Sequence, residues 1–388
     1  MKKTKLFIDA DPLVVDHFSG VGHSLLGMVK ALERRQQIDQ NIEIILFAPK
    51  RRLHKLNEWG FQSVQYRGIP LPRRGIMALQ RRHMLPPLDL WLGKGIYFFP
   101  NFLNWPLLYS KSITMIHDIS FEVHPEFVDP PNQKFLSSNV PYAAKRSYII
   151  ATVSPNAKCE IEEYYKEKSS KVKVIPNGID QTLFYKRDKE EILRKKAQYG
   201  IVGDYFIFVG NIEPRKNLIR MINAYKALPK NITDKIGLLL IGGGGWQDKE
   251  INNAMYQARY EGYKILRPYK YVPDSDLPAL YSGSKALIYP PIYEGFGMPP
   301  LEAMACQTPV VSTKVEPLPW VVGDAGVYVD PLSEESITKG MIEILNEKTR
   351  EQVVKKGLRQ VEEFSWDRSA RVIIEELIPK LQGNEGKS

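Results

Sequence analysis

Two neighbouring cations in the second half of the chain have the type and position of an anion-binding pair. Arg215 and Lys216 follow a short apolar run, Tyr205 to Val209, with only a turn between them. We expect both in the first turn of a helix, where positive charge opposes the helix dipole unless an anion binds there. A phosphate or diphosphate would be held by both side chains and by backbone N–H groups. The alternative is an exposed pair beside Glu213.

Two carboxylates further along the chain could bind hydroxyl groups. Glu294 and Glu302 lie eight positions apart, and Gly295 and Gly297 between them let the backbone pass close to a ligand. The two prolines after Gly297 suit a helix start, which places Glu302 in the first turn. There an acceptor-only carboxylate could hold two vicinal hydroxyls of a ribose. Helix-dipole stabilisation is the alternative for Glu302, but it explains neither Glu294 nor the glycines.

The first half offers weaker candidates. Gly20 and Gly22 follow an apolar run and precede an apolar helix, so they could bring backbone N–H groups to a phosphate or serve only a tight turn. His117 ends another run and could hydrogen-bond a sugar or acceptor hydroxyl. A buried structural histidine is the alternative there.

Three further motifs are weaker candidates for a metal-binding or phosphate-binding site. Asp9 and Asp11 have the spacing of metal ligands but no third carboxylate nearby, and Asp274 with Asp276 suits a helix cap. We therefore expect no metal and no bound cofactor. The glycine run 242–245 forms a permissive turn and lacks the Gly-Lys-Ser/Thr ending of a phosphate-binding loop.

The elements that must position these residues alternate along the whole chain. Short β-branched or aromatic runs separated by helix-length stretches are typical of parallel strands joined by crossover helices. The expected strands of the first half are Leu6 to Asp9, Ile42 to Phe47, Ile96 to Phe99, Ile113 to His117, Tyr148 to Val153 and Val172 to Ile175. Those of the second half are Tyr205 to Val209, Gly237 to Ile241, Lys264 to Leu266, Ala286 to Tyr289, Pro309 to Ser312 and Gly326 to Val329.

This pattern predicts two doubly wound α/β domains, in agreement with a length of 388 residues. The break should fall near Ile179 to Gly200, where a charged, helix-prone stretch follows a Pro-Asn-Gly turn. Ligands of open α/β sheets bind beyond the carboxyl ends of the strands, so we expect a site in a cleft between the domains.

Composition favours a cytoplasmic protein. The two cysteines, Cys159 and Cys306, show no ligand spacing and argue against a disulfide scaffold. The start of the chain does not resemble a signal peptide, and no apolar run approaches the roughly 18 residues of a membrane span.

Most of the net charge of +10 comes from the segment between Lys50 and Lys94, which contains ten lysines and arginines but only two carboxylates. Apolar side chains such as Met77, Met84 and Trp91 are mixed with these cations. Such a mixture suits an anionic membrane surface, although a solvated helix with its apolar face in the core is an equal alternative. No nucleic-acid-binding motif accompanies the charge, so we expect no nucleic acid.

Taken together, these motifs resemble glycosyltransferase family four, retaining enzymes of the GT-B fold that include bacterial lipopolysaccharide and O-antigen mannosyltransferases. The resemblance covers nearly the whole chain. It rests on the following segments: Gly20 to Gly22, His117-Asp118, Thr152 to Ser154, Ile175 to Gly178, Glu213 to Asn217, Val272 to Asp274, Glu294 to Glu302 and Phe364 to Trp366. The two carboxylates eight positions apart, together with the Arg-Lys pair, are its specific part.

The resemblance implies two Rossmann-like domains facing across a cleft. Residues 1–182 would form an acceptor-binding domain and residues 183–364 a nucleotide-sugar-binding domain. Residues 365–388 would form a helix that crosses back to the first domain. His23, Asp11 and Asn211 lie where related sequences often place a cation, so the diphosphate would depend mainly on Arg215 and Lys216.

The same resemblance implies the roles of individual residues. The catalytic set would be Glu294, His117, Arg215 and Lys216, with the two cations neutralising the donor diphosphate and His117 contacting the reacting sugar. Glu302 would bind the ribose, and Tyr271 and Val272 would border the base. The other donor-binding residues would be Gly20 and Gly22 at the diphosphate, and Gly295, Phe296 and Gly297 with Glu294 at the transferred sugar.

The implied activity is metal-independent transfer of a hexose, with mannose from GDP-mannose preferred and UDP-linked donors open. The acceptor would be a lipid-linked or cell-envelope glycan, presented at the anionic inner face of the cell membrane that the basic segment 50–94 contacts. Two alternatives remain: a soluble sugar-phosphate or sucrose-type synthase of the same fold, and a non-catalytic subunit that binds nucleotide sugars.

Overall fold

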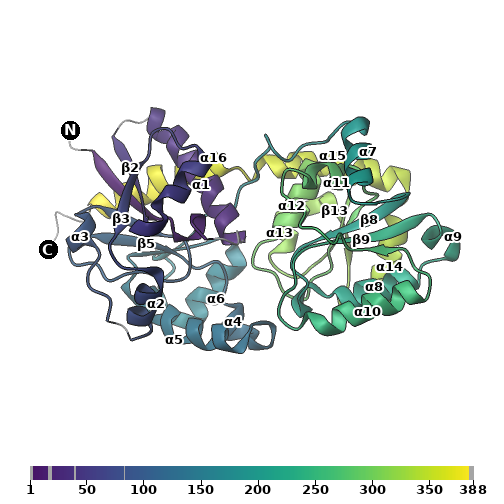
Figure 1. Cartoon of the computed structure of the whole chain (residues 1–388), viewed down its shortest axis with the longest axis horizontal. Helices are drawn as coiled ribbons and strands as arrows, with labels where there is room; N and C mark the ends of the chain where they lie inside the picture. Colours follow the sequence, from purple (N-terminus) through teal and green to yellow (C-terminus); the bar gives the residue numbers. More distant parts are fainter. Residues whose placement is uncertain (1–2, 16–19, 39–40, 83, 384–388) are drawn as a thin grey trace. The chain divides into compact units, whose positions relative to one another are not determined.

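Two parallel sheets organise the chain in the computed structural model, which describes residues 3–15, 20–38, 41–82 and 84–383 (Figure 1). Each sheet belongs to its own unit. The first unit comprises Met1–Gly178 and Ser365–Ser388, and the second comprises Ile179–Phe364. The division therefore falls slightly before the expected boundary at residue 182, directly after the Pro-Asn-Gly turn.

The first sheet has seven strands in the order β3-β2-β1-β4-β5-β6-β7. Their bounds are β1 Thr4–Asp9, β2 Ile42–Pro49, β3 Gln65–Ile69, β4 Ile96–Phe99, β5 Lys111–Met115, β6 Ile149–Thr152 and β7 Val172–Val174. Six of these were predicted, and β3 was not. Its alternating exposed and partly buried side chains include Arg67 and Gly68, so the apolar run that identifies a central strand is missing at this sheet edge.

Aromatic side chains build much of the core of the first unit. Phe7 of β1 stacks on Tyr97 of β4 with ring centroids 4.6 Å apart, and Phe47 and Phe99 pack beside them. All four rings are fully or almost fully buried. Burial on both faces of a parallel sheet explains why these strands are recognisable as continuous apolar runs.

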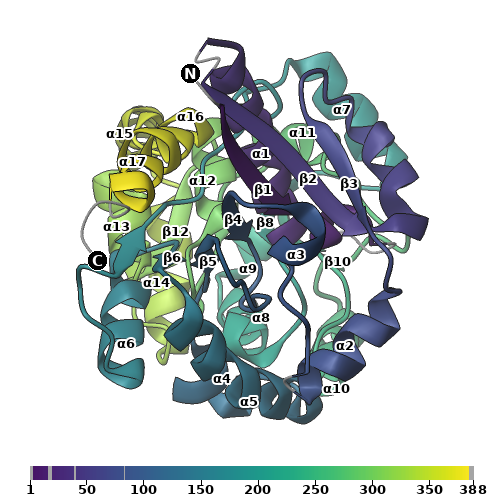
Figure 2. The ribbon, with the colours of Figure 1, turned by 90° about the vertical axis from the view of Figure 1, so that its left-hand side faces the viewer.

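The longer helices of the first unit are α1 (Gly20–Ile38), α5 (Pro130–Arg146) and α6 (Pro155–Tyr165). The shorter elements are η1 (Asp11–Leu13), η2 (Lys50–Trp59), α2 (Arg73–Arg81), α3 (Asp89–Leu92), α4 (Ser120–Val123), η3 (Pro125–Phe127), α16 (Trp366–Arg371), η6 (Val372–Leu377) and α17 (Ile378–Gln382). The last three come from the end of the chain, and α16 packs against α1 (Figure 2). The contact is so close that a Cβ atom on Gly27 would lie 2.3 Å from the Trp366 ring.

The second sheet has six strands in the order β10-β9-β8-β11-β12-β13, and all six were predicted. Their bounds are β8 Asp204–Val209, β9 Ile236–Ile241, β10 Ile265–Leu266, β11 Leu287–Ile288, β12 Val310–Thr313 and β13 Gly326–Val329. Both sheets share the strand order 3-2-1-4-5-6 of the dinucleotide-binding fold, the first with a seventh strand added.

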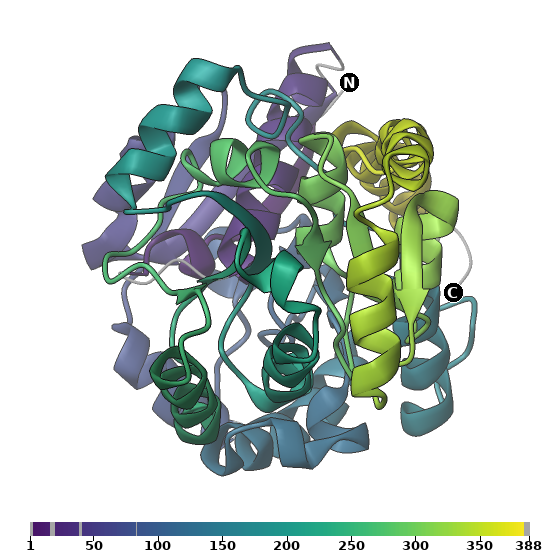
Figure 3. The same cartoon turned by 90° about the vertical axis from the view of Figure 1, so that its right-hand side faces the viewer.

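Helices cover both faces of the second sheet (Figures 1 and 3), with α8 and α10 on one face and α11 and α15 on the other. The helices are α7 (Lys189–Gln198), η4 (Pro214–Lys216), α8 (Leu218–Lys226), α9 (Lys230–Thr233), α10 (Asp248–Tyr260), α11 (Leu277–Ser282), α12 (Met298–Ala305), α13 (Leu318–Val322), η5 (Gly323–Ala325), α14 (Glu334–Glu343) and α15 (Glu347–Glu362). None of the helices in the described part of the chain combines the length and the apolar character that a membrane span requires.

Candidate active site

The strand order of the second sheet reverses between β8 and β11, which is the position where open α/β sheets bind their ligands. The turn after β8 carries Arg215 and Lys216, and the loop after β11 carries Glu294. Both segments therefore leave the same edge of the sheet at neighbouring strands. The sequence-predicted cations and one predicted carboxylate meet at this point.

Glu294 is the centre of a buried polar cluster. Its Oε2 atom accepts hydrogen bonds from the Lys216 ammonium and, at 2.5 Å, from the Tyr289 hydroxyl. Its Oε1 atom lies 3.5 Å from Nη1 of Arg215, and Nη2 of the same arginine pairs with Oε1 of Glu213 at 2.7 Å. Lys216 is 6% exposed and Glu294 8% exposed, so the charges are largely shielded from water. Buried charges of this kind are tolerated because they are paired and hydrogen-bonded.

The cluster fixes the protonation of its members. Burial alone would raise the pKa of Glu294, but the Lys216 and Arg215 charges outweigh burial and lower the pKa to about 2. Burial, followed by the charge of Arg215, lowers the pKa of Lys216. Burial and the Glu294 charge raise the pKa of Tyr289 well above its usual value. Glu294 is therefore an anion at neutral pH, and Tyr289 keeps the proton that it donates.

The turn that carries the two cations differs from the prediction. Arg215 and Lys216 lie in the separate 3-10 turn η4, and α8 begins only at Leu218. Asn217, between η4 and α8, has a left-handed conformation with φ of 63°, which separates the two elements. The Asn217 amide donates to the carbonyl oxygens of Pro290 at 3.0 Å and Pro331 at 2.6 Å. Asn217 thus ties the cation turn to the loop after β11.

The glycine run after β9 supports the same turn from the other side. A Cβ atom on Gly242 would lie 1.8 Å from the carbonyl oxygen of Gly210, and Gly242 has φ of 155°. Backbone hydrogen bonds join Gly210 to Ile241 at 2.9 Å and Ile212 to Gly243 at 2.9 Å. The run is therefore required for a close backbone approach that positions the segment before Arg215, and is more than the permissive turn that we expected.

Glu302 lies in the second turn of α12, because the helix begins four residues earlier, at Met298. The prediction of a first-turn position is wrong, although prolines do open the helix. The Oε2 atom of Glu302 accepts a hydrogen bond from the Tyr281 hydroxyl at 2.9 Å. Asp276 occupies the N-cap position of α11, as expected, but its carboxylate pairs with Lys195 at 2.6 Å and forms no cap hydrogen bond.

The residues after Glu294 shape the loop. Gly297 has φ of 108° and directly precedes α12, and a Cβ atom there would lie 2.6 Å from a Leu318 methyl group. Phe296 is 4% exposed and packs edge-on against Trp320 and Phe364. Its side chain is a packing group, so a ligand contact at this position would come from the backbone of Gly295 or Phe296.

A cavity of about 460 Å³ lies in the second unit, at the glycine run after β9. Gly242, Gly243, Tyr271 and Val272 line it, together with Arg267. The Arg267 guanidinium is held in place, since Nη1 donates to Asn252 at 2.9 Å and Nη2 to the Gly242 carbonyl oxygen at 3.2 Å. The two residues predicted to border a base thus line a cavity of suitable size.

His117 and the two predicted glycines belong to the first unit. The Nε2 atom of His117 donates to the Pro100 carbonyl oxygen at 2.9 Å, since a carbonyl can only accept. Burial lowers the pKa of His117, so the ring is neutral at pH 7 and its Nδ1 atom is an acceptor. Gly20 and Gly22 lie in the first turn of α1, not in a preceding turn as we expected. A Cβ atom on Gly20 would meet no atom within 4 Å, and the preceding Ser19 lies outside the described residues.

Tyr289 and Asn217 are residues of this site to which the sequence analysis assigned no role. Tyr289 appeared only as the last residue of a predicted strand. Asn217 followed the two cations without a sequence signal for its left-handed conformation. Within the described part of the chain, no three His, Cys, Asp or Glu side chains cluster in a way that suits a metal ion.

Comparison with known proteins gives matches in both sequence and structure. The family described as "Glycosyl transferases group 1" matches residues 189–360. O-antigen chain mannosyltransferase B of Escherichia coli is 32% identical over 361 residues, which cover 90% of this chain and 93% of that protein. O-antigen chain mannosyltransferase RfbU of Salmonella typhimurium is 30% identical over 60% of each chain.

Among solved structures, Anabaena HepE in complex with UDP and glucose superposes with a TM-score of 0.73 at 16% identity. The superposition covers 96% of this chain and 99% of that chain. At this identity, the likeness concerns the fold.

Proposed function

The chain belongs to the group 1 glycosyl transferases and has the predicted GT-B fold, and from this premise we propose that it transfers mannose from GDP-mannose to a glycan acceptor. Two relatives that carry the name O-antigen chain mannosyltransferase support this choice of sugar. Transfer would retain the configuration at the anomeric carbon, and the acceptor would be lipid-linked or otherwise presented at a membrane.

The observation that carries the proposal is the convergence of Arg215, Lys216 and Glu294 at the strand reversal of the second sheet. Departure of the nucleoside diphosphate places additional negative charge on its phosphate oxygens. Fixed cations at that point stabilise the transition state more than the ground state. An ammonium has three N–H donors, and Lys216 uses two of them for Tyr289 and Glu294, so the third is left for a phosphate oxygen.

The carboxylate of Glu294 would orient the transferred sugar. It is ionised, as its low pKa shows, and therefore acts only as a hydrogen-bond acceptor for sugar hydroxyls. Glycines at 295 and 297 allow the loop backbone to lie close to the ring. In the proposed reaction, the acceptor oxygen bonds to the anomeric carbon as the bond to phosphate breaks, and the acceptor proton moves to the leaving phosphate oxygen.

The cavity beside Tyr271 and Val272 would take the base. Arg267 on its wall is held by Asn252 and retains N–H groups that could donate to a base carbonyl. Guanine presents the O6 and N7 acceptor pair that arginine binds in other nucleotide sites. This supports a GDP-linked donor over a UDP-linked one. Because Arg215 and Lys216 would neutralise the diphosphate, the proposed reaction needs no metal.

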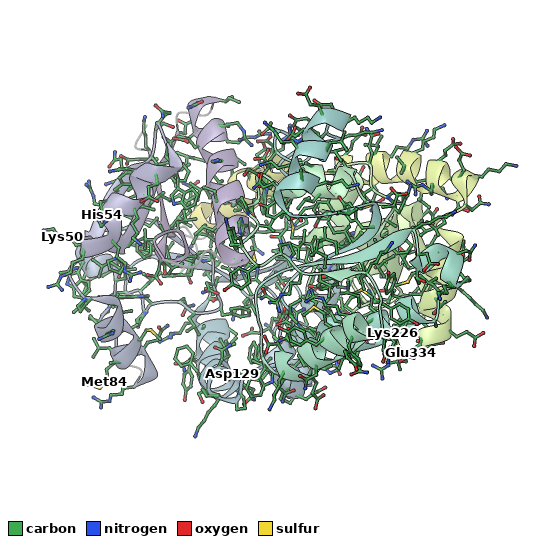
Figure 4. All side chains as sticks on the ribbon, turned by 45° about the vertical axis from the view of Figure 1, so that its right-hand side comes forward. Lys50, His54, Met84, Asp129, Lys226 and Glu334 are labelled. Atoms are coloured by element: carbon green, nitrogen blue, oxygen red, sulfur yellow. The ribbon has the colours of Figure 1, made fainter. Side chains whose placement is uncertain are left out.

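The first unit would bind the acceptor and contact an anionic membrane through the basic segment 50–94. Figure 4 labels Lys50 and His54 on η2 and Met84 beyond α2, all in this segment. Met84 is 65% exposed and Trp91 45% exposed, so apolar side chains accompany the cations at the surface. Vesicles of phosphatidylglycerol should bind the protein in a salt-sensitive manner, and Arg74→Glu with Arg82→Glu should abolish binding. Retained binding by this double variant would contradict the membrane contact.

The experiment that tests the transfer uses the full chain with GDP-mannose, UDP-glucose and UDP-galactose in the presence of EDTA. We expect GDP-mannose alone to raise the unfolding temperature and to be turned over. Lys216→Met should lower turnover by about a hundredfold or more, as for loss of an oxyanion donor. The matched control is Lys226→Met. Lys226, labelled in Figure 4, is a partly exposed residue of α8 in the same unit and pairs with Glu261. Unchanged turnover by Lys216→Met would favour a non-catalytic binding protein.

A further inference from the structure

Each of the two carboxylates expected at the donor accepts a hydrogen bond from a buried tyrosine. Tyr289 donates to Glu294, and Tyr281 donates to Oε2 of Glu302 at 2.9 Å. Both tyrosines are 0% exposed. Tyr281 lies on α11 and Glu302 on α12, so their bond joins two helices of the second unit. The fold therefore repeats one arrangement, in which a hydroxyl group holds a carboxylate from the protein interior.

Tyr281 has a fixed position in the second unit. Its carbonyl oxygen accepts hydrogen bonds from Oγ of Ser284 at 2.8 Å and from Oγ1 of Thr308 at 2.7 Å. Its ring packs edge-on against Phe184 with ring centroids 6.4 Å apart. Because the side chain is also fully buried, its hydroxyl cannot follow a moving Glu302. The hydrogen bond therefore restrains the glutamate and not the tyrosine.

The protonation of Tyr281 and the exposure of Glu302 suit this restraint. Burial, followed by the charge of Glu302, raises the pKa of Tyr281 well above its usual value. The hydroxyl therefore keeps its proton and remains a donor at neutral pH. Glu302 itself is partly exposed, whereas Ala303 and Met304 after it are buried. A ligand can thus approach Glu302 while Tyr281 holds its carboxylate.

A restrained carboxylate suits a pair of vicinal hydroxyls. A carboxylate accepts up to about four hydrogen bonds, so the bond from Tyr281 is compatible with two more from the hydroxyls of a ribose. A mobile glutamate would lose its torsional freedom on binding, and this loss weakens binding by up to about tenfold for one such side chain. The bond from Tyr281 restricts Glu302 before the nucleotide arrives, so less freedom is lost on binding.

We propose that Tyr281 is a positioning residue for ribose recognition, which acts through Glu302 and makes the site selective for nucleotides that carry both ribose hydroxyls. This inference rests on the proposed function, because it needs a nucleotide bound at Glu302. The alternative is that the bond only fastens α11 to α12. A fastening bond would affect all nucleotides alike, whereas a positioning bond affects only nucleotides with ribose hydroxyls.

The test measures the binding of GDP and 2′,3′-dideoxy-GDP to the full chain by isothermal titration calorimetry in EDTA. The dideoxy nucleotide keeps the base and the diphosphate but lacks both hydroxyls. We expect the unmodified protein to bind it about a hundredfold more weakly than GDP, because hydrogen bonds to a charged group are lost. Tyr281→Phe should bind GDP about tenfold more weakly and the dideoxy nucleotide equally well. The ratio of the two affinities should therefore fall to about tenfold.

Tyr225→Phe is the matched control. Tyr225 is a fully buried tyrosine of α8 in the same unit, and its hydroxyl donates to the carbonyl oxygen of Ile236 at 2.9 Å. This variant loses one buried hydrogen bond that does not involve Glu302, so both nucleotides should bind as they do to the unmodified protein. Unfolding temperatures check that all variants fold.

A double-mutant cycle tests whether Tyr281 acts through Glu302. In a Glu302→Ala background, Tyr281→Phe should have no further effect on GDP binding, because the residue that it positions is absent. A further loss of GDP binding in this background would overturn the proposal. So would equal weakening of both nucleotides by Tyr281→Phe alone, or unchanged GDP binding by that variant.

The kinetics of GDP-mannose turnover provide a second readout. The ribose does not change during the reaction, so its contacts contribute equally to the ground state and the transition state. Tyr281→Phe should therefore raise KM and leave kcat within about twofold of the unmodified protein. A fall in kcat with unchanged KM would contradict a role in ribose recognition.

Parallel measurements with UDP and 2′,3′-dideoxy-UDP separate this inference from the proposed donor. If GDP binds more tightly than UDP but Tyr281→Phe does not narrow the ratio, the Tyr281 proposal is wrong and the GDP-linked donor stands. If UDP binds more tightly and Tyr281→Phe narrows its ratio, the Tyr281 proposal stands and the GDP-linked donor is wrong. If neither nucleotide binds, both are wrong.

Discussion

The hydroxyl oxygen of Tyr289 lies 2.6 Å from the Nζ atom of Lys216 and accepts a hydrogen bond from it. The same hydroxyl donates to Glu294 at 2.5 Å, so Tyr289 bridges a buried cation and a buried anion. Tyr289 is 0% exposed, which leaves its ring no freedom to turn away. Tyr289 therefore sets where the Lys216 ammonium lies, although it is itself a positioning residue and not a charged one.

Removal of this bridge should affect rate more than stability. We expect Tyr289→Phe to cost about 1 kcal/mol of unfolding free energy, the usual net value of one hydrogen bond. Turnover of the donor should fall about tenfold, because the ammonium of Lys216 loses its defined position. Tyr205→Phe is the control, since the buried Tyr205 hydroxyl donates to Leu280 in the same unit. Tyr205→Phe should lower the unfolding free energy by a similar amount without lowering turnover. Equal turnover by both variants would contradict a positioning role for Tyr289.

The low pKa of Glu294 predicts a specific pH dependence of stability. The folded-state pKa of about 2 lies below the ordinary value of 4.5, so ionised Glu294 stabilises the fold fully above about pH 4.5. This contribution is lost as the pH falls toward 2, and it is on the order of 3 kcal/mol.

Denaturant unfolding of the unmodified protein and Glu294→Gln at several pH values measures this contribution. The difference in unfolding free energy should be largest at neutral pH and should shrink between pH 4.5 and 2. Glu334→Gln, at the start of α14 (Figure 4), is the matched control, because it removes a carboxylate of the same unit that lies outside this cluster. A constant difference for Glu294→Gln would show that the carboxylate is not stabilised by its neighbours.

The glycine run after β9 allows a test with two adjacent substitutions. Gly242→Ala should destabilise the second unit by several kcal/mol and weaken donor binding, because its Cβ atom would collide with the Gly210 backbone. Gly243→Ala should leave stability within about 0.5 kcal/mol, since its Cβ atom would meet no atom within 4 Å. Thermal unfolding of both variants checks the prediction. Equal unfolding temperatures would mean that the two loops do not approach as closely as described.

His117 should produce an acid limb in the pH profile of kcat/KM. Because burial lowers its pKa below 6.5, the ring is neutral at pH 7 and protonates only at lower pH. Protonation converts the Nδ1 acceptor into a donor, so kcat/KM should fall as the pH drops below 6.5. The limb should vanish in His117→Asn and persist in His124→Asn, a histidine of the same unit that pairs with Glu126. A limb that persists in His117→Asn would assign it to another group.

Most strands and the main cations of the site could be predicted because their signals are local. Buried parallel strands are continuous apolar runs, and ligand-binding residues follow such runs closely. The edge strand β3 was missed, since its side chains alternate in exposure and include an arginine and a glycine. The turn η4 was misplaced because the left-handed Asn217 interrupts the helix, and this conformation depends on carbonyl groups of distant loops.

Tertiary contacts also decided the partners of several predicted residues. Phe296 was expected at the transferred sugar, but its ring packs with Trp320 and Phe364, which lie far along the chain. The hydrogen bond from Tyr289 to Glu294 and the ion pair between Asp276 and Lys195 form only because the fold brings their elements together. The spacing of these residues in the sequence does not predict either contact. The carboxylate Glu294 was singled out by its position in the sequence, while the ion pairs and hydrogen bonds that lower its pKa were visible only in three dimensions.

The indole ring of Trp366 packs against Gly27 of α1, and the backbone of Trp366 lies against Gly178. During synthesis on the ribosome, the first 178 residues emerge long before this tryptophan does. The second unit is a continuous stretch and can finish folding as soon as Phe364 has left the exit tunnel. The surface of α1 around Gly27 stays uncovered until translation has passed Trp366, so the first unit gains its last contacts after the second unit has been fully synthesised.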